Sequence, residues 1–237
     1  RTSCYAFQAG GERTPIGRTK TLPREAGRVR LAVVSCSNYP AGYFNVYRCV
    51  ANRSDLDAVL HLGDYIYEFA DGLYGDSQAT GPTPLPAGEA ISLADYRLRY
   101  AIYRSDVHLQ EVPPPHPFIV VWDDHEIAND AWSGGAANHD ATEGDWSQRR
   151  AAAYRAYMEW LPVREAPEDG IHLHRDFRFG GLVDLLMLDT RGFRDRQLYS
   201  GSSAEIYAPS RTLLGAPQEE WLFDRLRGSQ RSGTPWR

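Results

Sequence analysis

FIVVWDDHE, residues 118–126, is an apolar run that changes abruptly to three carboxylates and one histidine. Three other stretches have the same form: LAVVSCSN at 31–38, AVLHLGDYIYE at 58–68 and LVDLLMLDTRGFR at 182–194. Short apolar strands of an α/β sheet carry ligand-binding side chains at their carboxyl ends. One such junction means little. Four of them, rich in Cys, Asp, His, Tyr and Arg, predict one shared site at the strand ends.

Length and composition set broad bounds on the molecule. The chain has 237 residues, enough for one large domain or two small ones, and a net charge of −5. This charge disfavours nucleic acid as the main partner. No apolar run approaches the roughly 18 residues of a membrane span. No signal peptide is recognisable at Arg1, and three cysteines leave open one disulfide with an odd thiol or three free thiols.

The elements around the four strands follow from periodicity and turn residues. Residues 1–24 predict a hairpin that ends in an edge strand, and residues 24–30 form a polar linker. Helices are expected at 43–52, from Ser92 onward with Asp95 in a capping box, at 147–161 and at 217–226. Residues 71–88 predict an exposed loop. A strand at 171–179, followed by Gly180-Gly181, predicts a hairpin and hence a mixed sheet.

A first set of candidate ligands follows the strands at 31–34 and 58–62. Asp64 comes after Gly63, and Tyr67 returns to the side of Asp64 if the turn between them is helical. A thiolate and a phenolate need a strongly acidic cation near neutral pH, so Cys36, Asp64 and Tyr67 suit trivalent iron better than magnesium. The alternative is that Cys36 is a buried structural cysteine and Tyr67 a packing residue.

A second set lies at residues 123–129. Three carboxylates and an imidazole in four residues repel one another without a cation, and become ligands when hard cations are present. The carboxylates of this cluster, Asp124 among them, are therefore candidate metal ligands, as is the Asn129 oxygen, and His125 is a candidate proton donor or phosphate contact. Capping of a helix N-terminus is the alternative for Asp123, Glu126 and Asn129.

The fourth junction adds basic residues. Arg191 and Arg194 could clamp an anionic group, or form an internal salt bridge to Asp189 or Glu126. His61 is expected to be a core histidine, and the remaining histidines have no partner at metal-ligand spacing: His108, His116, His139, His172 and His174. The sequence contains no Gly-x-Ser-x-Gly elbow, glycine-rich phosphate loop or Cys-x-x-Cys pair, which disfavours serine hydrolases, kinases and zinc fingers.

With these motifs in order, the chain resembles the PhoD-like alkaline phosphatases, a branch of the calcineurin-like metallophosphoesterases. The matching stretches are VSCS (34–37), HLGDYIYE (61–68), WDDHE (122–126), LDTRGFR (188–194) and LGAPQEEWL (214–222). The pair GDYIY and WDDHE is specific. The resemblance implies a mixed two-sheet α/β sandwich flanked by helices, with residues 1–24 as the last hairpin of a preceding β-sandwich domain and residues 30–237 as the N-terminal part of the catalytic domain.

The resemblance also implies a chemistry. Iron(III) would be held by Cys36, Asp64 and Tyr67, and Asp64 would also face a calcium ion. Asp124 stands where related phosphoesterases carry the asparagine of their Gly-Asn-His motif, and His125 stands at the histidine of that motif. The expected reaction is hydrolysis of small-molecule phosphate monoesters or diesters by metal-activated hydroxide, with Arg191 as an anion clamp.

Two departures qualify this expectation. Residues 5–21 resemble only the tail of the family's N-terminal domain, and the chain stops near Trp236, before the part where relatives supply a Gly-Asp-x-His-type ligand set. The alternatives are a truncated, inactive metal- or phosphate-binding domain, or half of an enzyme that a second chain completes. By resemblance the protein would be secreted or periplasmic.

Overall fold

The centre of the molecule is a three-stranded parallel sheet. The computed structural model describes residues 2–164 and 173–237. The sheet contains β5 (Leu31–Val34), β6 (Ala58–His61) and β7 (Phe118–Val120) in that order. Val34 lies opposite His61, and His61 lies opposite Val120. The carboxyl ends of the three strands therefore meet at one edge, as the apolar runs predict.

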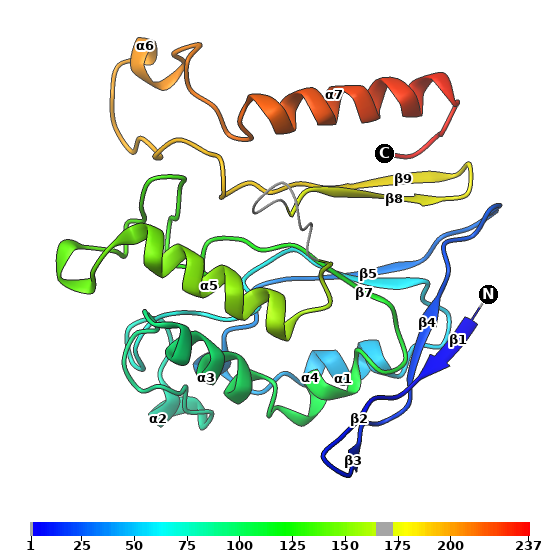
Figure 1. Cartoon of the computed structure of the whole chain (residues 1–237), viewed down its shortest axis with the longest axis horizontal. Coiled ribbons are helices and arrows are strands. Elements are labelled where there is room, and N and C mark those ends of the chain that lie inside the picture. The colour runs from blue at the N-terminus through cyan, green and yellow to red at the C-terminus, as the bar shows by residue number, and fades with distance from the viewer. Residues whose placement is uncertain (1, 165–172) are drawn as a thin grey trace.

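Helices cover one face of this sheet, and a hairpin with a long helix covers the other (Figure 1). The first face carries α1 (Asn45–Ala51), α3 (Leu93–Tyr103), α4 (Val107–Glu111) and α5 (Trp146–Trp160). The second carries β8 (Arg175–Phe179) and β9 (Val183–Met187), beyond which lies α7 (Ala216–Arg231). Short elements complete the chain: η1 (Tyr39–Ala41), α2 (Ser77–Thr80), η2 (Ala141–Glu143) and α6 (Ser203–Ile206). The mixed α/β class with helices on both sides is confirmed.

The antiparallel hairpin differs from the expected mixed sheet. Among the described residues, β8 pairs only with β9, and the two form a sheet of their own beside the parallel one. Between the two sheets, the Arg175 guanidinium donates to the carbonyl of Val120 at the end of β7. A side chain thus takes an acceptor that a neighbouring strand would use. The predicted start of this strand at residues 171–172, with His172, lies outside the described residues.

The predicted helices are confirmed with small shifts at their ends. Ser92 and Asp95 form the expected capping box at the start of α3. Tyr157 on α5 is fully buried, and its ring packs 5.8 Å from the ring of Trp122 in the sheet. Arg99 on α3 is also buried, because its guanidinium donates to the carbonyls of five residues on the segment after β6: Tyr67, Phe69, Leu85, Pro86 and Gly88. This one side chain fixes much of the long loop at 71–88.

The N-terminal segment is a curled double hairpin. β1 (Thr2–Tyr5) pairs with β4 (Gly17–Lys20), and β2 (Gln8–Ala9) pairs with β3 (Glu12–Arg13) at its tip. Among its contacts with the rest of the chain, Arg18 N–H donates to the Pro114 carbonyl at 2.6 Å, and Lys20 Nζ donates to the Leu56 carbonyl at 2.9 Å and lies 3.3 Å from Asp57. Its membership of a separate domain stays a prediction. Among the described residues, no helix has the length and apolarity needed to cross a membrane.

Candidate metal centre

The loops after β5 and β6 are held side by side at the sheet edge. Cys36 N–H donates to the Gly63 carbonyl at 3.2 Å, and Ser37 N–H donates to the Asp64 carbonyl at 2.8 Å. Cys36 has φ 60° and Asp64 has φ 54°, both in the left-handed region that non-glycine residues rarely adopt. Such strain persists where the surrounding structure imposes it, and it is concentrated at functional sites. The two side chains are brought together by this local geometry.

The loops after β6 and β7 also touch. Gly63 has φ 107°, and a Cβ atom at this position would lie 2.3 Å from the backbone nitrogen of Asp123. Only glycine permits that approach. Glu126, which is fully buried, then joins the loops: its carboxylate accepts from Tyr65 N–H at 2.5 Å and from Asp123 N–H at 2.8 Å. Glu126 is therefore a clamp between the loops rather than a simple helix cap.

The structure brings together the three residues expected to hold iron. Cys36 Sγ lies 3.4 Å from Asp64 Oδ2, and the Tyr67 hydroxyl lies 3.3 Å from the same oxygen. Burial raises the pKa of the Cys36 thiol, and burial together with the charge of Asp64 raises the pKa of the Tyr67 phenol. In the absence of a cation, both groups are thus neutral donors to Asp64.

A second triangle shares Asp64. One potential ligand atom each from Asp64, Asp124 and His125 lies within 4.8 Å of the others, and all three residues are buried. Among the described residues, Asp64 Oδ1 is buried without a hydrogen-bond partner. A buried acceptor of this kind is costly unless a donor or cation meets it. The donor set of carboxylates, thiol and phenol therefore fits a cationic centre at the strand ends, with the His125 imidazole beside it.

His125 is held on two sides. Its Nδ1 atom lies 2.8 Å from Glu68 Oε2, and its ring stacks on Tyr67 at a centroid distance of 4.1 Å. Burial opposes the charged imidazolium, but the hydrogen bond and charge of Glu68, with the charges of Asp124 and Asp64, raise the pKa of His125 to about 9. Such an imidazole can donate a proton.

Glu68 is the functional residue that sequence reasoning missed. It is fully buried, and Oε1 accepts from Asn129 N–H at 2.5 Å while Oε2 faces His125. A carboxylate inside the aromatic stretch Tyr65-Ile66-Tyr67-Glu68-Phe69 was the signal, because a charged residue in such surroundings needs a dedicated partner. Asn129 contacts this set through its backbone, and its side-chain Nδ2 lies 3.5 Å from Asp130. Its role as a metal ligand stays a prediction.

Arg191 forms a salt bridge, but to other residues than those expected. Its guanidinium lies 2.5 Å from Asp123, 3.3 Å from Asp124 and 3.9 Å from Asp130. Asp189, one of the two expected partners, instead accepts from backbone N–H groups and from Trp122 Nε1 at 2.8 Å, which fixes the turn that carries Arg191. The other, Glu126, is occupied by backbone donors. Arg191 thus lies at the edge of the candidate metal centre.

The remaining predicted residues fall outside the centre. His61 is a core histidine, as expected: its Nε2 lies 3.1 Å from the Tyr47 hydroxyl and 3.2 Å from Ser37 Oγ, and burial lowers its pKa to about 3. His108, His116, His139 and His174 contact neighbours elsewhere in the fold. All three cysteines are free thiols.

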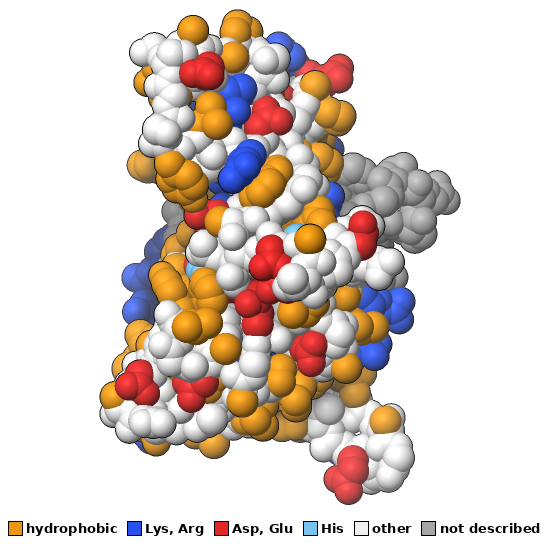
Figure 2. Space-filling model, turned by 90° about the vertical axis from the view of Figure 1, so that its left-hand side faces the viewer, with side chains coloured by type: hydrophobic (Ala, Val, Ile, Leu, Met, Phe, Trp, Pro, Cys, Tyr) orange, Lys and Arg blue, Asp and Glu red, His pale blue; other side chains and the backbone are white. Residues whose placement is uncertain are grey.

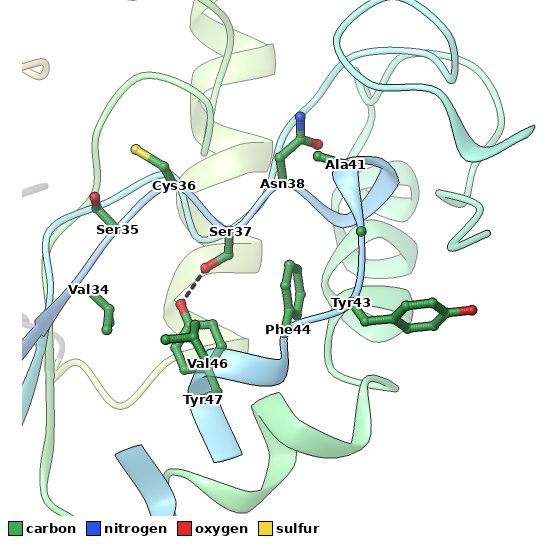
Figure 3. A pocket seen from close by; sticks show the side chains of 11 residues that line it. Val34, Ser35, Cys36, Ser37, Asn38, Ala41, Tyr43, Phe44, Val46 and Tyr47 are labelled. Atoms are coloured by element: carbon green, nitrogen blue, oxygen red, sulfur yellow. Dashed lines mark hydrogen bonds between the residues drawn. The ribbon is translucent and has the colours of Figure 1, made fainter. Parts of the chain in front are cut away.

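A pocket of about 310 Å³ adjoins Cys36 between β5 and α1. Figure 3 shows its lining, in which the Ser37 hydroxyl bonds to the Tyr47 hydroxyl while the Cys36 sulfur points away from the Phe44 ring. Cys36 lines this pocket, and its sulfur also lies 3.4 Å from Asp64 Oδ2, so the pocket borders the candidate metal centre. Figure 2 shows one face of the molecule, where acidic and hydrophobic side chains are interspersed, in keeping with the net charge of −5.

Comparisons with known proteins identify the family of the chain. A family model described as PhoD-like phosphatase matches residues 31–237. Alkaline phosphatase D of Bacillus subtilis (strain 168) is 40% identical over 237 residues, which cover 95% of this chain and 40% of the relative. A solved structure of PhoD matches with a TM-score of 0.86 and 38% identity, covering 97% of this chain and 45% of that one. The chain spans less than half the length of these relatives, and it belongs to the PhoD-like phosphatase family.

Proposed function

We propose that this chain supplies metal ligands and phosphate contacts to a hydrolase of small-molecule phosphate esters. The observation that supports this most directly is the buried triangle of Asp64, Asp124 and His125, in which Asp64 Oδ1 has no partner among the described residues. Family membership supports phosphoester hydrolysis as the reaction.

The donors divide between a position with thiol and phenol ligands and a position with oxygen ligands alone. Cys36 and Tyr67 would hold iron(III) together with Asp64, because thiolate and phenolate ligands suit a strongly acidic cation. Asp124, with Asn129 as a further candidate, would hold calcium, for which oxygen ligands are preferred. Asp64 would serve both ions, since one carboxylate oxygen faces Cys36 and Tyr67 while the other has no partner.

Bound cations of this kind lower the pKa of water and neutralise the charge of a phosphate group. The chain's own residues would do the rest. His125, held by Glu68, would donate a proton to the departing oxygen of the ester. Arg191, at the edge of the centre, would pair with phosphate oxygens and release part of its contact with Asp123.

The second candidate is a domain that binds metal or phosphate without turnover, or one that hydrolyses phosphate esters only together with a second chain. The chain spans 40% to 45% of the length of its relatives. We propose a secreted or periplasmic location on family grounds alone.

Hydrolysis assays separate these readings. The chain, loaded with iron(III) and calcium, is assayed on p-nitrophenyl phosphate and bis-p-nitrophenyl phosphate, alone and mixed with a separately expressed C-terminal half of the Bacillus relative. Turnover that Asp124→Ala abolishes, and that the exposed control Asp224→Ala keeps, supports the hydrolase. Turnover only in the mixture supports the split enzyme. Metal binding without turnover in either form contradicts hydrolysis and leaves the binding domain.

A further inference from the structure

The side-chain amide of Asn138 contacts Glu68, the carboxylate partner of His125. Asn138, on the loop between β7 and α5, donates from Nδ2 to Glu68 Oε1 at 3.1 Å and to Glu89 Oε1 at 3.0 Å. The two hydrogens of one nitrogen are thus directed at two carboxylates. Asn138 contacts Oε1 of Glu68, whereas His125 contacts Oε2, so the two residues bind different oxygens of one carboxylate.

The far side of this bridge is anchored by a buried cation. Arg149 on α5 has a side chain that is 0% exposed. Its guanidinium lies 2.5 Å from Glu89 Oε1 and 2.9 Å from Glu143 Oε2, and it donates to the Asn138 backbone carbonyl at 3.0 Å. Arg149 offsets the negative charges and fixes the backbone of Asn138 independently of its side chain.

We propose that Asn138 is a positioning residue for His125, acting through Glu68. Glu68 Oε2 lies 2.8 Å from His125 Nδ1, and this contact orients the imidazole ring. Rotation of the Glu68 carboxylate would release that orientation. The Asn138 amide opposes this rotation together with Asn129 N–H, because Oε1 accepts from both. The Asn138 nitrogen is in turn held by Glu89, which pairs with Arg149. This inference rests on the proposed function of His125.

The test follows the imidazole itself. Chain labelled with ¹⁵N-histidine is studied by long-range ¹H–¹⁵N correlation, and the His125 signals are assigned by their loss in His125→Gln. We compare Asn138→Ala and Asn138→Ser with the exposed control Asn52→Ala. Serine is too short to span both carboxylates, and the backbone contact of residue 138 with Arg149 is unchanged in both variants. Because two variants are compared, the test still gives a result if one of them does not fold.

The expected result is faster exchange of the Nδ1 proton with water, on the order of tenfold, in both Asn138 variants and not in Asn52→Ala. In the form of the protein that hydrolyses p-nitrophenyl phosphate, kcat falls on the order of tenfold with KM unchanged. Exchange and ring signals equal to those of the wild type would overturn the inference, whatever the turnover. Absence of turnover in the wild type would instead overturn the proposed function. The exchange rate of the Nδ1 proton would still decide whether Asn138 positions His125.

Discussion

The Cys36 sulfur lies 3.4 Å from Oδ2 of Asp64, although 28 residues separate them in the chain. Both residues adopt positive φ angles at the ends of neighbouring parallel strands. The backbone conformation of the two residues therefore brings their side chains together. This geometry underlies each of the following expectations.

Gly63→Ala should destabilise the protein strongly. The added Cβ would lie 2.3 Å from the Asp123 backbone nitrogen, at a residue with φ 107°, so the loops after β6 and β7 must separate. We expect a loss of about 3 kcal/mol in the free energy of unfolding, measured by urea denaturation. Gly27→Ala is the matched control, because a Cβ there meets nothing within 4 Å. Equal stabilities of the two variants would refute the close approach of the loops.

Asp64→Asn should have opposite effects with and without metal. In chelator, the substitution removes a buried charge that lies near Asp123 and Asp124, and it should raise the free energy of unfolding by about 1 kcal/mol. With iron(III) and calcium present, the wild type should gain stability from binding while the variant gains little. Thermal unfolding in both conditions checks this. An equal metal-dependent rise in melting temperature for both proteins would exclude Asp64 as a shared ligand.

His61 should make the protein sensitive to acid. Burial lowers the folded-state pKa of this histidine to about 3, below the value of about 6.5 in an unfolded chain. The unfolded state then binds the extra proton, so the contribution of neutral His61 is complete above pH 6.5 and is lost as the pH falls towards 3. Between pH 7 and pH 5, the wild type should lose about 2 kcal/mol more stability than His61→Gln. Urea denaturation at the two pH values measures this, with His108→Gln as control. A wild type and His61→Gln with parallel pH profiles would contradict a neutral, buried His61.

Arg191→Ala should weaken phosphate binding. Its guanidinium is the cation nearest to Asp123 and Asp124 among the described salt bridges, and charge-assisted bonds to phosphate oxygens contribute about 1.5–3 kcal/mol. We expect KM for p-nitrophenyl phosphate to rise on the order of tenfold or more, with a smaller change in kcat. Arg155→Ala on the exposed face of α5 serves as control. An unchanged KM would restrict Arg191 to the structural salt bridge.

Much of the site could be predicted because strand ends are visible in sequence. Apolar runs that stop at Cys36, Asp64 and Asp124 locate three ends of one parallel sheet, and adjacent parallel strands necessarily bring those ends together. The meeting of Cys36 and Asp64 follows from this topology, and Tyr67 reaches the same oxygen through a bend in the chain rather than a helical turn. Local sequence patterns were enough to predict that these side chains meet, because each one is placed by the strand that precedes it.

Other features depend on partners that no local pattern identifies. Glu68 owes its role to Asn138, which is 70 residues away, and to a histidine on another loop. The sequence predicts that Arg191 forms a salt bridge but not with which residues. The turn at Asp189 directs its guanidinium towards Asp123. The β8–β9 hairpin forms a sheet of its own, and Arg175 at its start contacts the Val120 carbonyl 55 residues away.

Metal content tests the central claim most directly. The purified chain is incubated with iron(III) and calcium, passed through a desalting column and measured by inductively coupled plasma mass spectrometry, beside Cys36→Ser and Cys49→Ser. Both thiols are free, but only Cys36 lies beside Asp64. We predict near-stoichiometric iron in the wild type and in Cys49→Ser, and a loss of most iron in Cys36→Ser. Equal iron in all three proteins, or none in the wild type, would contradict a metal centre built on Cys36 and Asp64.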